Sequence, residues 1–493
     1  MTVTDLIANP GPETDAQALF EEARRRRRRR RFMVVAALVL ALASALGGYL
    51  SSRAGNTPRT AATVNRSLKP VVDATAFDHH GNLAFVSRGT LWVLGGSPVH
   101  LHSIPTRHLT PSNPTFSPDG RWLAFVASKE KAEGFGFYEV ISSQLWLARS
   151  NGTEAHPVQG LAFDAEFGWN PRQDLLAVSV GKAETVPFFN PTGIDLVSPT
   201  GSIRTLVRGT HIWGADWSPD GSELAVSTEV PSSGFNGTRA VLATYPLSGA
   251  QPTRWFDTDT QEANIIVPAG WWRGWGIGYF TVGGGAVPGG SGSADGSPLY
   301  AIATPGSTPF LLGKALESEG AGSPSVSSTG SLAFVSNEPN QNVGRILTQG
   351  KEIVVCSPTT RVCRAVAHSP DTVTEDPAWS PSGSMLDYVQ APVIESFGFF
   401  QPALANWYNA HQLLSFDPST GSVRDNTATS GATAPQWSTN GKTLLYVSND
   451  GLWLRDSAAT APVQVAQPLF TPGQWPSYYG QVAFSSQFSW SSE

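Results

Sequence analysis

The chain has 493 residues, of which 40% are hydrophobic and 15% charged, and it contains 49 Gly and 37 Pro. This turn-rich composition is typical of exported β-rich proteins and supplies enough apolar side chains for a large core. The net charge is −6; since residues 1–31 hold eight Arg and five acidic residues (+3), the remainder carries −6 − 3 = −9. An acidic bulk argues against nucleic-acid binding, because neutralising phosphates requires a basic surface.

An apolar, uncharged run fills residues 32–50, directly after the block Arg24–Arg31. At about 1.5 Å per residue it spans a bilayer core of about 30 Å. The positive-inside rule then predicts a cytoplasmic segment at 1–31, a transmembrane helix at 32–50, a linker at 51–69 and an extracytoplasmic domain at 70–493. The Arg block is interpreted as a topology signal rather than a nucleic-acid patch. A signal peptide cleaved near Ala43-Ser44-Ala45 is the alternative.

A repeat fills the rest of the chain at a spacing of roughly fifty residues, which suits propeller blades. Its clearest copies are Phe116-Ser117-Pro118-Asp119-Gly120 and Trp217-Ser218-Pro219-Asp220-Gly221, each followed by a short apolar strand. Pro, Asp and Gly suit the successive positions of a tight turn. The landmark residue before each turn is one of Phe77, Phe116, Trp169, Trp217, Trp272, Val326, Trp379 and Trp437.

Each unit also contains a later apolar strand, such as Leu145-Trp146-Leu147 or Leu452-Trp453-Leu454. A unit therefore supplies four strands, and the sequence predicts an all-β fold, a β-propeller of about eight four-stranded blades preceded by one transmembrane helix. Seven blades with a rebuilt end remain open. The final Gln487-Phe488-Ser489-Trp490 resembles one more inner strand, which would close the ring.

The Trp-Ser-Pro-Asp-Gly pattern followed by an apolar strand resembles the TolB-like β-propeller repeat, which also occurs in the propellers of prolyl oligopeptidase-type enzymes. The resemblance covers roughly residues 70–493 and implies a fold rather than an activity. Those enzymes join a propeller to a catalytic domain with a G-x-S-x-G motif. This chain has no G-x-S-x-G, and the blades leave no room for such a domain.

Few residues suggest chemistry. His100 and His102 would share one strand face but come without a carboxylate cluster, so we expect no metal site. Asp119 and Asp220 lie in tight turns, where a structural role is expected. We therefore predict no catalytic residue, metal or cofactor. Cys356 and Cys363 would face each other across a hairpin between third and fourth strands, and a structural disulfide is predicted.

A second pattern recurs in the loops between second and third strands: Glu, any residue, an apolar residue, Gly or Pro, Phe, then Phe or Tyr. These loops share one face of a propeller, where grouped insertions often build a binding surface. The candidate ligand- or partner-binding residues are Glu133, Phe137, Tyr138, Glu184, Phe188, Phe189, Glu395, Phe399, Phe400, Trp407 and Tyr408.

Two interpretations of this pattern stay open. The aromatic side chains would either pack between blades or form an aromatic and acidic rim that binds a partner. The sequence favours a non-catalytic scaffold at a bacterial cell envelope, anchored by one pass through the membrane, whose partner is an envelope protein, peptide or glycan. The alternative is a propeller enzyme acting on a glycan or peptide at the channel mouth. A sensory ectodomain is disfavoured, since the cytoplasmic segment is too short for a receiving domain.

Overall fold

The computed structural model describes residues 69–134, 137–182, 190–209, 211–231, 238–258, 265–282, 296–316, 324–336, 350–393, 407–426, 430–456, 461–469 and 484–492. The chain divides into two compact units, Met1–Val64 and Asn65–Glu493. Every described residue belongs to the second unit. Within those ranges no helix is long and apolar enough for a membrane span, and the apolar run at 32–50 lies outside them.

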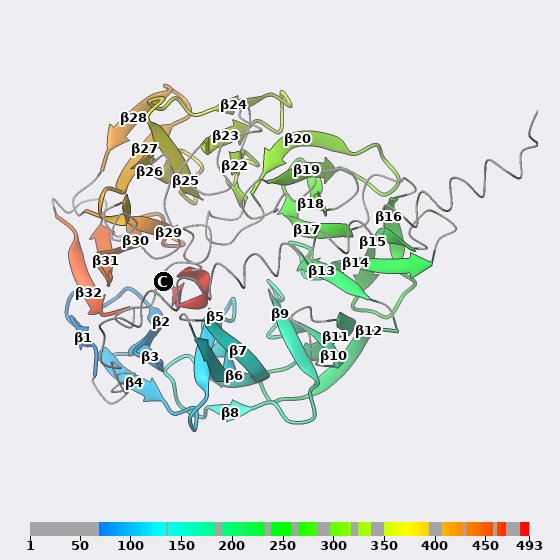
Figure 1. Cartoon of the computed structure of the whole chain (residues 1–493), viewed down its shortest axis with the longest axis horizontal. Coiled ribbons are helices and arrows are strands. Elements are labelled where there is room, and N and C mark those ends of the chain that lie inside the picture. The colour runs from blue at the N-terminus through cyan, green and yellow to red at the C-terminus, as the bar shows by residue number, and fades with distance from the viewer. Residues whose placement is uncertain are drawn as a thin grey trace, which may run out of the picture. The chain divides into compact units, whose positions relative to one another are not determined.

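The described residues form a ring of four-stranded antiparallel sheets, which makes the second unit a β-propeller (Figure 1). One sheet has eight strands, but a single residue pair, Ala315 with Ser336, joins its two halves. Counted by strand order, the described part of the chain contains eight four-stranded blades. This count agrees with the repeat in the sequence.

The blades run in chain order around the ring, with each first strand nearest the centre and each fourth strand at the edge (Figure 1). The first strands are β33 (Phe488–Ser491), β5 (Thr110–Phe116), β9 (Phe163–Trp169), β13 (Ile212–Trp217), β17 (Ile265–Trp272), β21 (Ser325–Val326), β25 (Thr372–Trp379) and β29 (Thr433–Trp437). The second strands are β2 (Asn82–Ser87), β6 (Trp122–Gly134), β10 (Leu176–Lys182), β14 (Glu223–Pro231), β18 (Gly276–Val282), β22 (Leu332–Ser336), β26 (Leu386–Pro392) and β30 (Thr443–Ser448).

The outer two strands of each blade complete the sheets. The third strands are β3 (Thr90–Gly95), β7 (Phe137–Arg149), β11 (Asn190–Val197), β15 (Thr238–Pro246), β19 (Ser297–Ile302), β23 (Glu352–Cys356), β27 (Gln412–Asp417) and β31 (Gly451–Asp456). The fourth strands are β4 (His100–Ile104), β8 (His156–Pro157), β12 (Ile203–Arg208), β16 (Thr253–Asp257), β20 (Phe310–Ala315), β24 (Cys363–Ala365), β28 (Ser422–Asp425) and β32 (Val463–Gln467).

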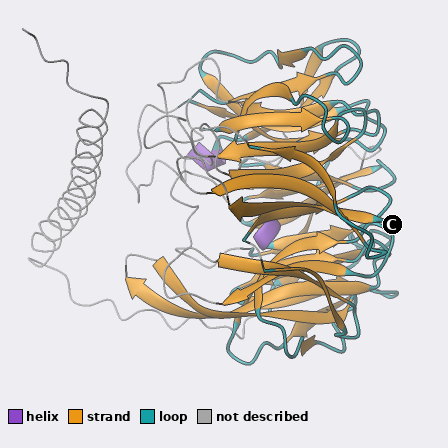
Figure 2. Cartoon of the chain, turned by 90° about the vertical axis from the view of Figure 1, so that its right-hand side faces the viewer, coloured by secondary structure: helices purple, strands orange, loops and turns teal. Residues whose placement is uncertain are grey.

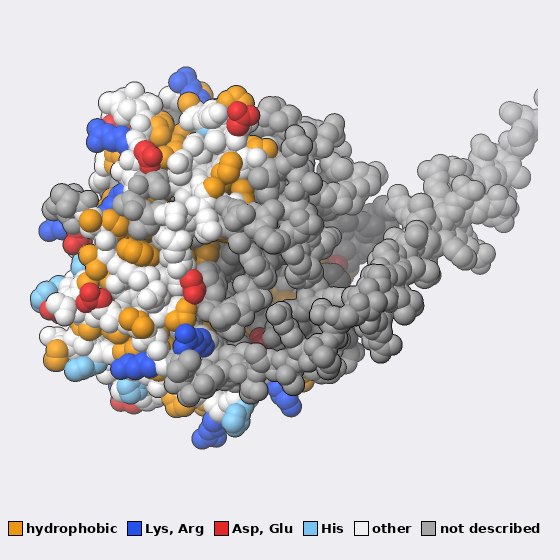
Figure 3. All heavy atoms as spheres, turned by 60° about the vertical axis from the view of Figure 1, so that its left-hand side comes forward, with side chains coloured by type: hydrophobic (Ala, Val, Ile, Leu, Met, Phe, Trp, Pro, Cys, Tyr) orange, Lys and Arg blue, Asp and Glu red, His pale blue; other side chains and the backbone are white. Residues whose placement is uncertain are grey.

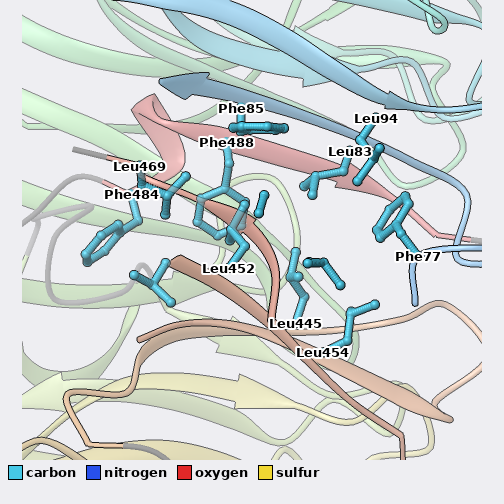
Figure 4. Packing of buried hydrophobic residues seen from close by; sticks show 13 residues of the cluster. Phe77, Leu83, Phe85, Leu94, Leu445, Leu452, Leu454, Leu469, Phe484 and Phe488 are labelled. Carbon is cyan, nitrogen blue, oxygen red and sulfur yellow. The ribbon is translucent and has the colours of Figure 1, made fainter. Parts of the chain in front are cut away.

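Both ends of the propeller contribute to ring closure. The C-terminal strand β33 pairs with β2 and is the inner strand of the first blade, which confirms the predicted closing strand. A short 3-10 helix, η2 (Phe484–Ser486), precedes β33. At the other end β1 (Val71–Val72) pairs with β32 as a fifth strand of the last blade. Figure 4 shows Phe77, Phe85 and Phe488 among the side chains that fill the core between these two blades.

The strand register corrects two predicted landmarks. Residues at the landmark position pair with a fully buried Leu or Ile near the start of each second strand. In the fifth blade that residue is Trp271, which pairs with Ile277, and not Trp272, because the register shifts between Pro268 and Gly270. In the first blade it is Trp490 of the closing strand. Phe77 is buried but lies on no strand, since the C-terminus supplies that inner strand.

Landmark tryptophans connect neighbouring blades. The indole N–H of Trp217 donates to the Gly168 carbonyl of the preceding blade at 3.0 Å. Trp169 and Trp271 make the equivalent bonds to the Thr115 and Asp216 carbonyls. An aromatic residue with a donor at its edge can fill the space between two sheets and also satisfy a backbone carbonyl. The repeated Trp therefore serves the architecture.

The Ser-Pro-Asp-Gly turns are held by their own side chains. The Ser117 hydroxyl donates to Asp119, and Ser218 donates to Asp220 in the same way. Gly120 adopts a φ of 67°, a left-handed conformation that glycine reaches without strain. Both aspartates thus act within their own turns, which confirms the structural role predicted for them.

The two cysteines lie opposite each other in the hairpin between β23 and β24, with Cα atoms 4.0 Å apart, and they form a disulfide. This is the predicted pairing. It ties the third strand of the sixth blade to its edge strand, which has only three residues.

A buried carboxyl lies in the core of the seventh blade. Asp387 of β26 is fully buried, accepts a hydrogen bond from the Ser415 hydroxyl, and Asn426 in turn donates to Ser415. Burial raises the pKa of Asp387 from 3.8 to about 6, although Ser415 and the charge of Arg455 oppose the shift. Removing a carboxylate from water disfavours its charged form.

This shift predicts a pH dependence of stability. Between about pH 4 and pH 6 the folded chain keeps the Asp387 proton that the unfolded chain releases, so the free energy of unfolding falls as pH rises, by about 3 kcal/mol from this group. Asp387→Asn is expected to remove that part of the decline. Urea unfolding at pH 4 and pH 7 measures it. An unchanged decline in the variant would contradict the assignment to Asp387.

Candidate functional site

The two faces of the ring differ in the connections they carry. We call the face where first strands end in Ser-Pro-Asp-Gly-type turns the turn face, and the opposite face, where second strands lead to third strands, the insertion face. On the insertion face, β2 to β3 and β30 to β31 are joined by two-residue turns. The fifth to seventh blades have long connections there: 283–296, 337–351 and 393–411. Insertions are therefore concentrated on one face.

The structure places some of the predicted binding residues on strands. Glu133 lies near the end of β6, and Phe137 and Tyr138 begin β7, so the second blade carries its motif at the tip of a hairpin. Trp407 and Tyr408 precede β27. The remaining candidates lie outside the described residues: Glu184, Phe188, Phe189, Glu395, Phe399 and Phe400.

Trp407 lies beneath the insertion face rather than on it. Its side chain is 2% exposed, packs in the core between the sixth and seventh blades and donates its indole N–H to the Pro392 carbonyl at 2.8 Å. It also contacts the rings of Tyr408 and His411 edge-on, with centroids 5.2 and 4.5 Å away. Trp407 is therefore a packing residue that supports its neighbours.

Tyr408 and His411 belong to a buried polar group that also contains Glu375 and Asp376. We call these four residues the acid–imidazole cluster. Glu375 and Asp376 lie on the inner strand β25, where the register with β26 shifts between Glu375 and Ala378 and Asp376 takes a φ of +52°. A bulge of this kind redirects side chains within a strand. His411 immediately precedes β27 at the insertion face.

Asp376 links the cluster to the last blade. Its carboxylate accepts a hydrogen bond of 2.6 Å from the Thr433 hydroxyl and one of 2.9 Å from the Ala434 N–H, both on β29. Burial raises the pKa of Asp376, and these two donors oppose that shift. Asp376 is thus held in place by the neighbouring sheet.

Glu375 and His411 form the centre of the cluster. Their nearest atoms, Glu375 Oε1 and His411 Nδ1, are 3.6 Å apart, and their side chains are 4% and 0% exposed. Burial, with the charge of Asp376 second, raises the pKa of Glu375 well above its usual value, whereas burial lowers the pKa of His411 to about 3. Burial therefore favours the protonated form of the Glu375 carboxyl and the neutral form of the His411 imidazole.

The same surroundings act on Tyr408. Burial and then the charges of Glu375 and Asp376 raise the pKa of its hydroxyl well above the usual value, so the phenol stays neutral. A protonated acid, a neutral imidazole and a phenol are groups that transfer protons when a substrate reaches them. Here the carboxyl and the imidazole are buried, an arrangement that suits a structural role beside β27.

The sequence analysis missed Glu375, Asp376 and His411. A usable signal existed: two adjacent acids interrupt an inner strand shortly before the landmark Trp379, whereas no other first strand among the described residues has two acids in a row. Nothing in the sequence around His411 indicates its role, because that role depends on its contact with Glu375 on another strand of the blade. Within the described ranges, no group of three or more His, Cys, Asp or Glu side chains is placed to hold a metal ion.

The side of the ring seen in Figure 3 shows no concentration of charge of a single sign. Figure 3 shows Lys and Arg side chains interspersed with Asp and Glu on the side of the ring that it presents. Several surface charges are paired, for example Arg121 with Asp174 at 3.2 Å and Arg149 with Glu154 at 3.0 Å. Exposed pairs of this kind add little stability.

No family model matches the chain, and no curated protein matches it. Several solved structures share its fold. Dipeptidyl peptidase 4 of Porphyromonas gingivalis is 10% identical with a TM-score of 0.50, over 83% of this chain and 62% of that one. The β-propeller domain of the trilobed protease of Pyrococcus furiosus (11% identity, TM-score 0.42, 73% and 97% covered) and an oligogalacturonate lyase (12%, 0.39, 85% and 89%) are also similar. Such low identity shows the β-propeller fold alone.

Proposed function

We propose that this chain is a membrane-anchored, extracytoplasmic β-propeller of the TolB-like type that binds a protein, peptide or glycan of a bacterial cell envelope without catalysing a reaction. The observation that carries the proposal is the placement of the long connections on one face. Repeat scaffolds use grouped insertions as binding surfaces, because loops vary while the strands hold them in place. The anchor is proposed from residues 24–50 of the sequence.

The acid–imidazole cluster supports a binding role over a catalytic one. Glu375 and His411 have the shifted pKa values expected of acid–base groups, but both side chains are buried. Shifted pKa values also arise in structural networks. Asp376 accepts a hydrogen bond from the next blade, and Trp407 packs against the strands beneath, so the cluster holds residues 407–411 in place before β27.

Capture of a partner tests the proposal. The full chain, tagged at its C-terminus and solubilised in detergent, is expected to capture an envelope component that the triple variant Phe137→Ala, Phe188→Ala, Phe399→Ala loses. The matched control is Phe310→Ala, because Phe310 is 38% exposed and begins the fourth strand β20 at the turn face. Equal capture by the triple variant, with its unfolding midpoint unchanged, would contradict a binding role for the insertion face.

The second candidate function is an enzyme that acts on a glycan or peptide at the insertion face, in which Glu375 and His411 would be the acid–base groups if a substrate reached them. Glu375→Gln separates the two functions. It keeps the size of the side chain and removes the transferable proton. A hydrolytic or lyase activity of the full chain that this variant abolishes, with partner capture retained, would establish the enzyme.

A further inference from the structure

The eight joints between neighbouring blades are not equally apolar. Blades contact each other through the faces of their sheets, which Figure 2 shows from the side of the ring. Within the described ranges each joint holds one cluster of buried apolar side chains. The cluster between the seventh and eighth blades has four members, Leu413, Ala432, Leu444 and Tyr446, whereas the other seven clusters have eight to thirteen. Because apolar burial is the main favourable term in folding, this joint has the least hydrophobic stabilisation.

The joint at which the two chain ends meet is not the weak one. The eighth and first blades share a cluster of thirteen buried apolar residues, which includes Phe77, Phe85 and Phe488 (Figure 4). The closing strand β33 is also paired with β2 over four residues. The least apolar joint of the ring therefore lies one blade before the place where the chain closes on itself.

A buried carboxyl bridges the joint between the seventh and eighth blades. Asp376 of β25 accepts hydrogen bonds from the Thr433 hydroxyl at 2.6 Å and from the Ala434 N–H at 2.9 Å, both on β29. Burial raises the pKa of Asp376, although these two donors oppose the shift. The titratable side chains around it are Glu375, Tyr408 and His411 of the acid–imidazole cluster, whose own shifts favour their neutral forms.

A second buried carboxyl faces the same joint. Asp387 of β26 is fully buried, and burial raises its pKa to about 6. The groups that oppose this shift are Ser415 of its own blade and, from the eighth blade, the charge of Arg455 on β31 and the indole N–H of Trp437 on β29. Arg455 also donates to the Asn426 carbonyl at 3.3 Å, so it is shared between the two blades. The joint thus combines the smallest apolar cluster with two buried acids.

The joint between the fourth and fifth blades offers a comparison. Asp216 of β13 is also largely buried, and burial raises its pKa to about 6. That joint, however, has eight buried apolar residues, and the Trp271 indole N–H donates to the Asp216 carbonyl across it. A buried acid therefore occurs there in a joint that apolar packing and an indole bond hold together.

We propose that the joint between the seventh and eighth blades is a proton-controlled opening of the ring, which is closed while Asp376 and Asp387 are protonated and loosens when they ionise. Local opening lets water reach the two carboxylates and exposes little apolar surface, so it costs less here than at the other joints. It also separates Asp376 from β29. The acid–imidazole cluster then loses its link to the eighth blade.

The pH range follows from the direction of the shifts. A carboxyl whose pKa is raised by folding contributes stability below its unfolded value, and this contribution is lost as pH rises through the folded value. For Asp387 that range runs from 3.8 to about 6. A difference of about two pKa units corresponds to a change of about a hundredfold in the equilibrium constant for opening. The joint is therefore expected to be tight near pH 4 and loose near pH 7.

Hydrogen exchange of two backbone amides tests the proposal in the full chain. The Ala434 amide donates to Asp376 across the joint between the seventh and eighth blades. The Ile353 amide is its matched comparison, because it donates to the Thr374 hydroxyl at 2.7 Å across the joint between the sixth and seventh blades. From pH 4 to pH 7 the protection factor of Ala434, corrected for intrinsic exchange at each pH, is expected to fall by up to about a hundredfold. That of Ile353 is expected to stay constant.

Two variants assign the effect to a residue. Asp387→Asn removes the ionisable group at nearly constant size and is expected to keep most of the Ala434 protection at pH 7. Asp216→Asn is its control: it removes the comparable carboxyl of the other joint and is expected to leave the fall at Ala434 unchanged. A fall at Ala434 that persists in Asp387→Asn would overturn the role of Asp387.

The wild-type chain alone also decides the proposal, should Asp387→Asn fail to fold. An equal fall at Ala434 and Ile353 would mean that the seventh blade or the whole ring loosens, and no fall at either amide would mean that the joint does not respond to protons. Both results contradict a proton-controlled joint. A fall at Ala434 with Ile353 unchanged supports it.

Discussion

Trp217→Ala is expected to lower the free energy of unfolding by about 3–5 kcal/mol, the range for removing a buried aromatic side chain. The side chain is 6% exposed and packs in the core between the third and fourth blades. The change leaves a cavity at the blade interface and also removes the N–H bond to the Gly168 carbonyl. Urea or thermal unfolding of the full chain measures the loss.

Trp217→Phe separates the two contributions. It keeps most of the apolar area and removes the indole donor, so a smaller cost of about 1 kcal/mol is expected for the lost bond. The matched control is Trp213→Phe on the same strand, because the Trp213 indole N–H has no hydrogen-bond partner among the described residues. If Trp213→Phe loses as much stability as Trp217→Phe, the hydrogen bond between blades does not explain why Trp recurs at the landmark position.

The repeat made the fold predictable, because its landmark is a structural device that recurs in sequence. Turn chemistry and strand periodicity are local, so Asp119, Asp220 and the cysteine pair could be placed from the sequence alone. The predicted landmark residue was wrong in two blades, where the neighbouring sequence does not define the strand pairing. In the fifth blade two tryptophans are adjacent and only the register between Pro268 and Gly270 selects Trp271. In the first blade the inner strand comes from the other end of the chain.

The candidate site was less predictable, because it depends on contacts between segments distant in sequence. Trp407 was predicted at a surface as an aromatic residue in a long insertion. Only the packing of β25 to β27 shows that it lies below that surface. The acid–imidazole cluster combines residues from β25, the approach to β27 and, through Thr433, the next blade. The spacing of these residues in the sequence does not indicate that they come together in the fold.

The two chain ends contribute unequally to closing the ring, and Phe488 shows the difference. Its side chain is 1% exposed, lies in the core shared by the first and last blades, and belongs to the inner strand β33 (Figure 4). Phe488→Ala is expected to cost about 3–5 kcal/mol. Val71 of β1 is 67% exposed at the periphery, so Val71→Ala is expected to change stability by less than about 0.5 kcal/mol.

The two terminal strands also differ in length and position. β1 is a two-residue strand at the edge of the last blade, whereas β33 has four residues and is the inner strand of the first blade. β1 can therefore detach from β32 while the inner strand stays paired with β2. Urea unfolding of the two variants tests this premise. Equal losses from Phe488→Ala and Val71→Ala would mean that the N-terminal strand shares in closure.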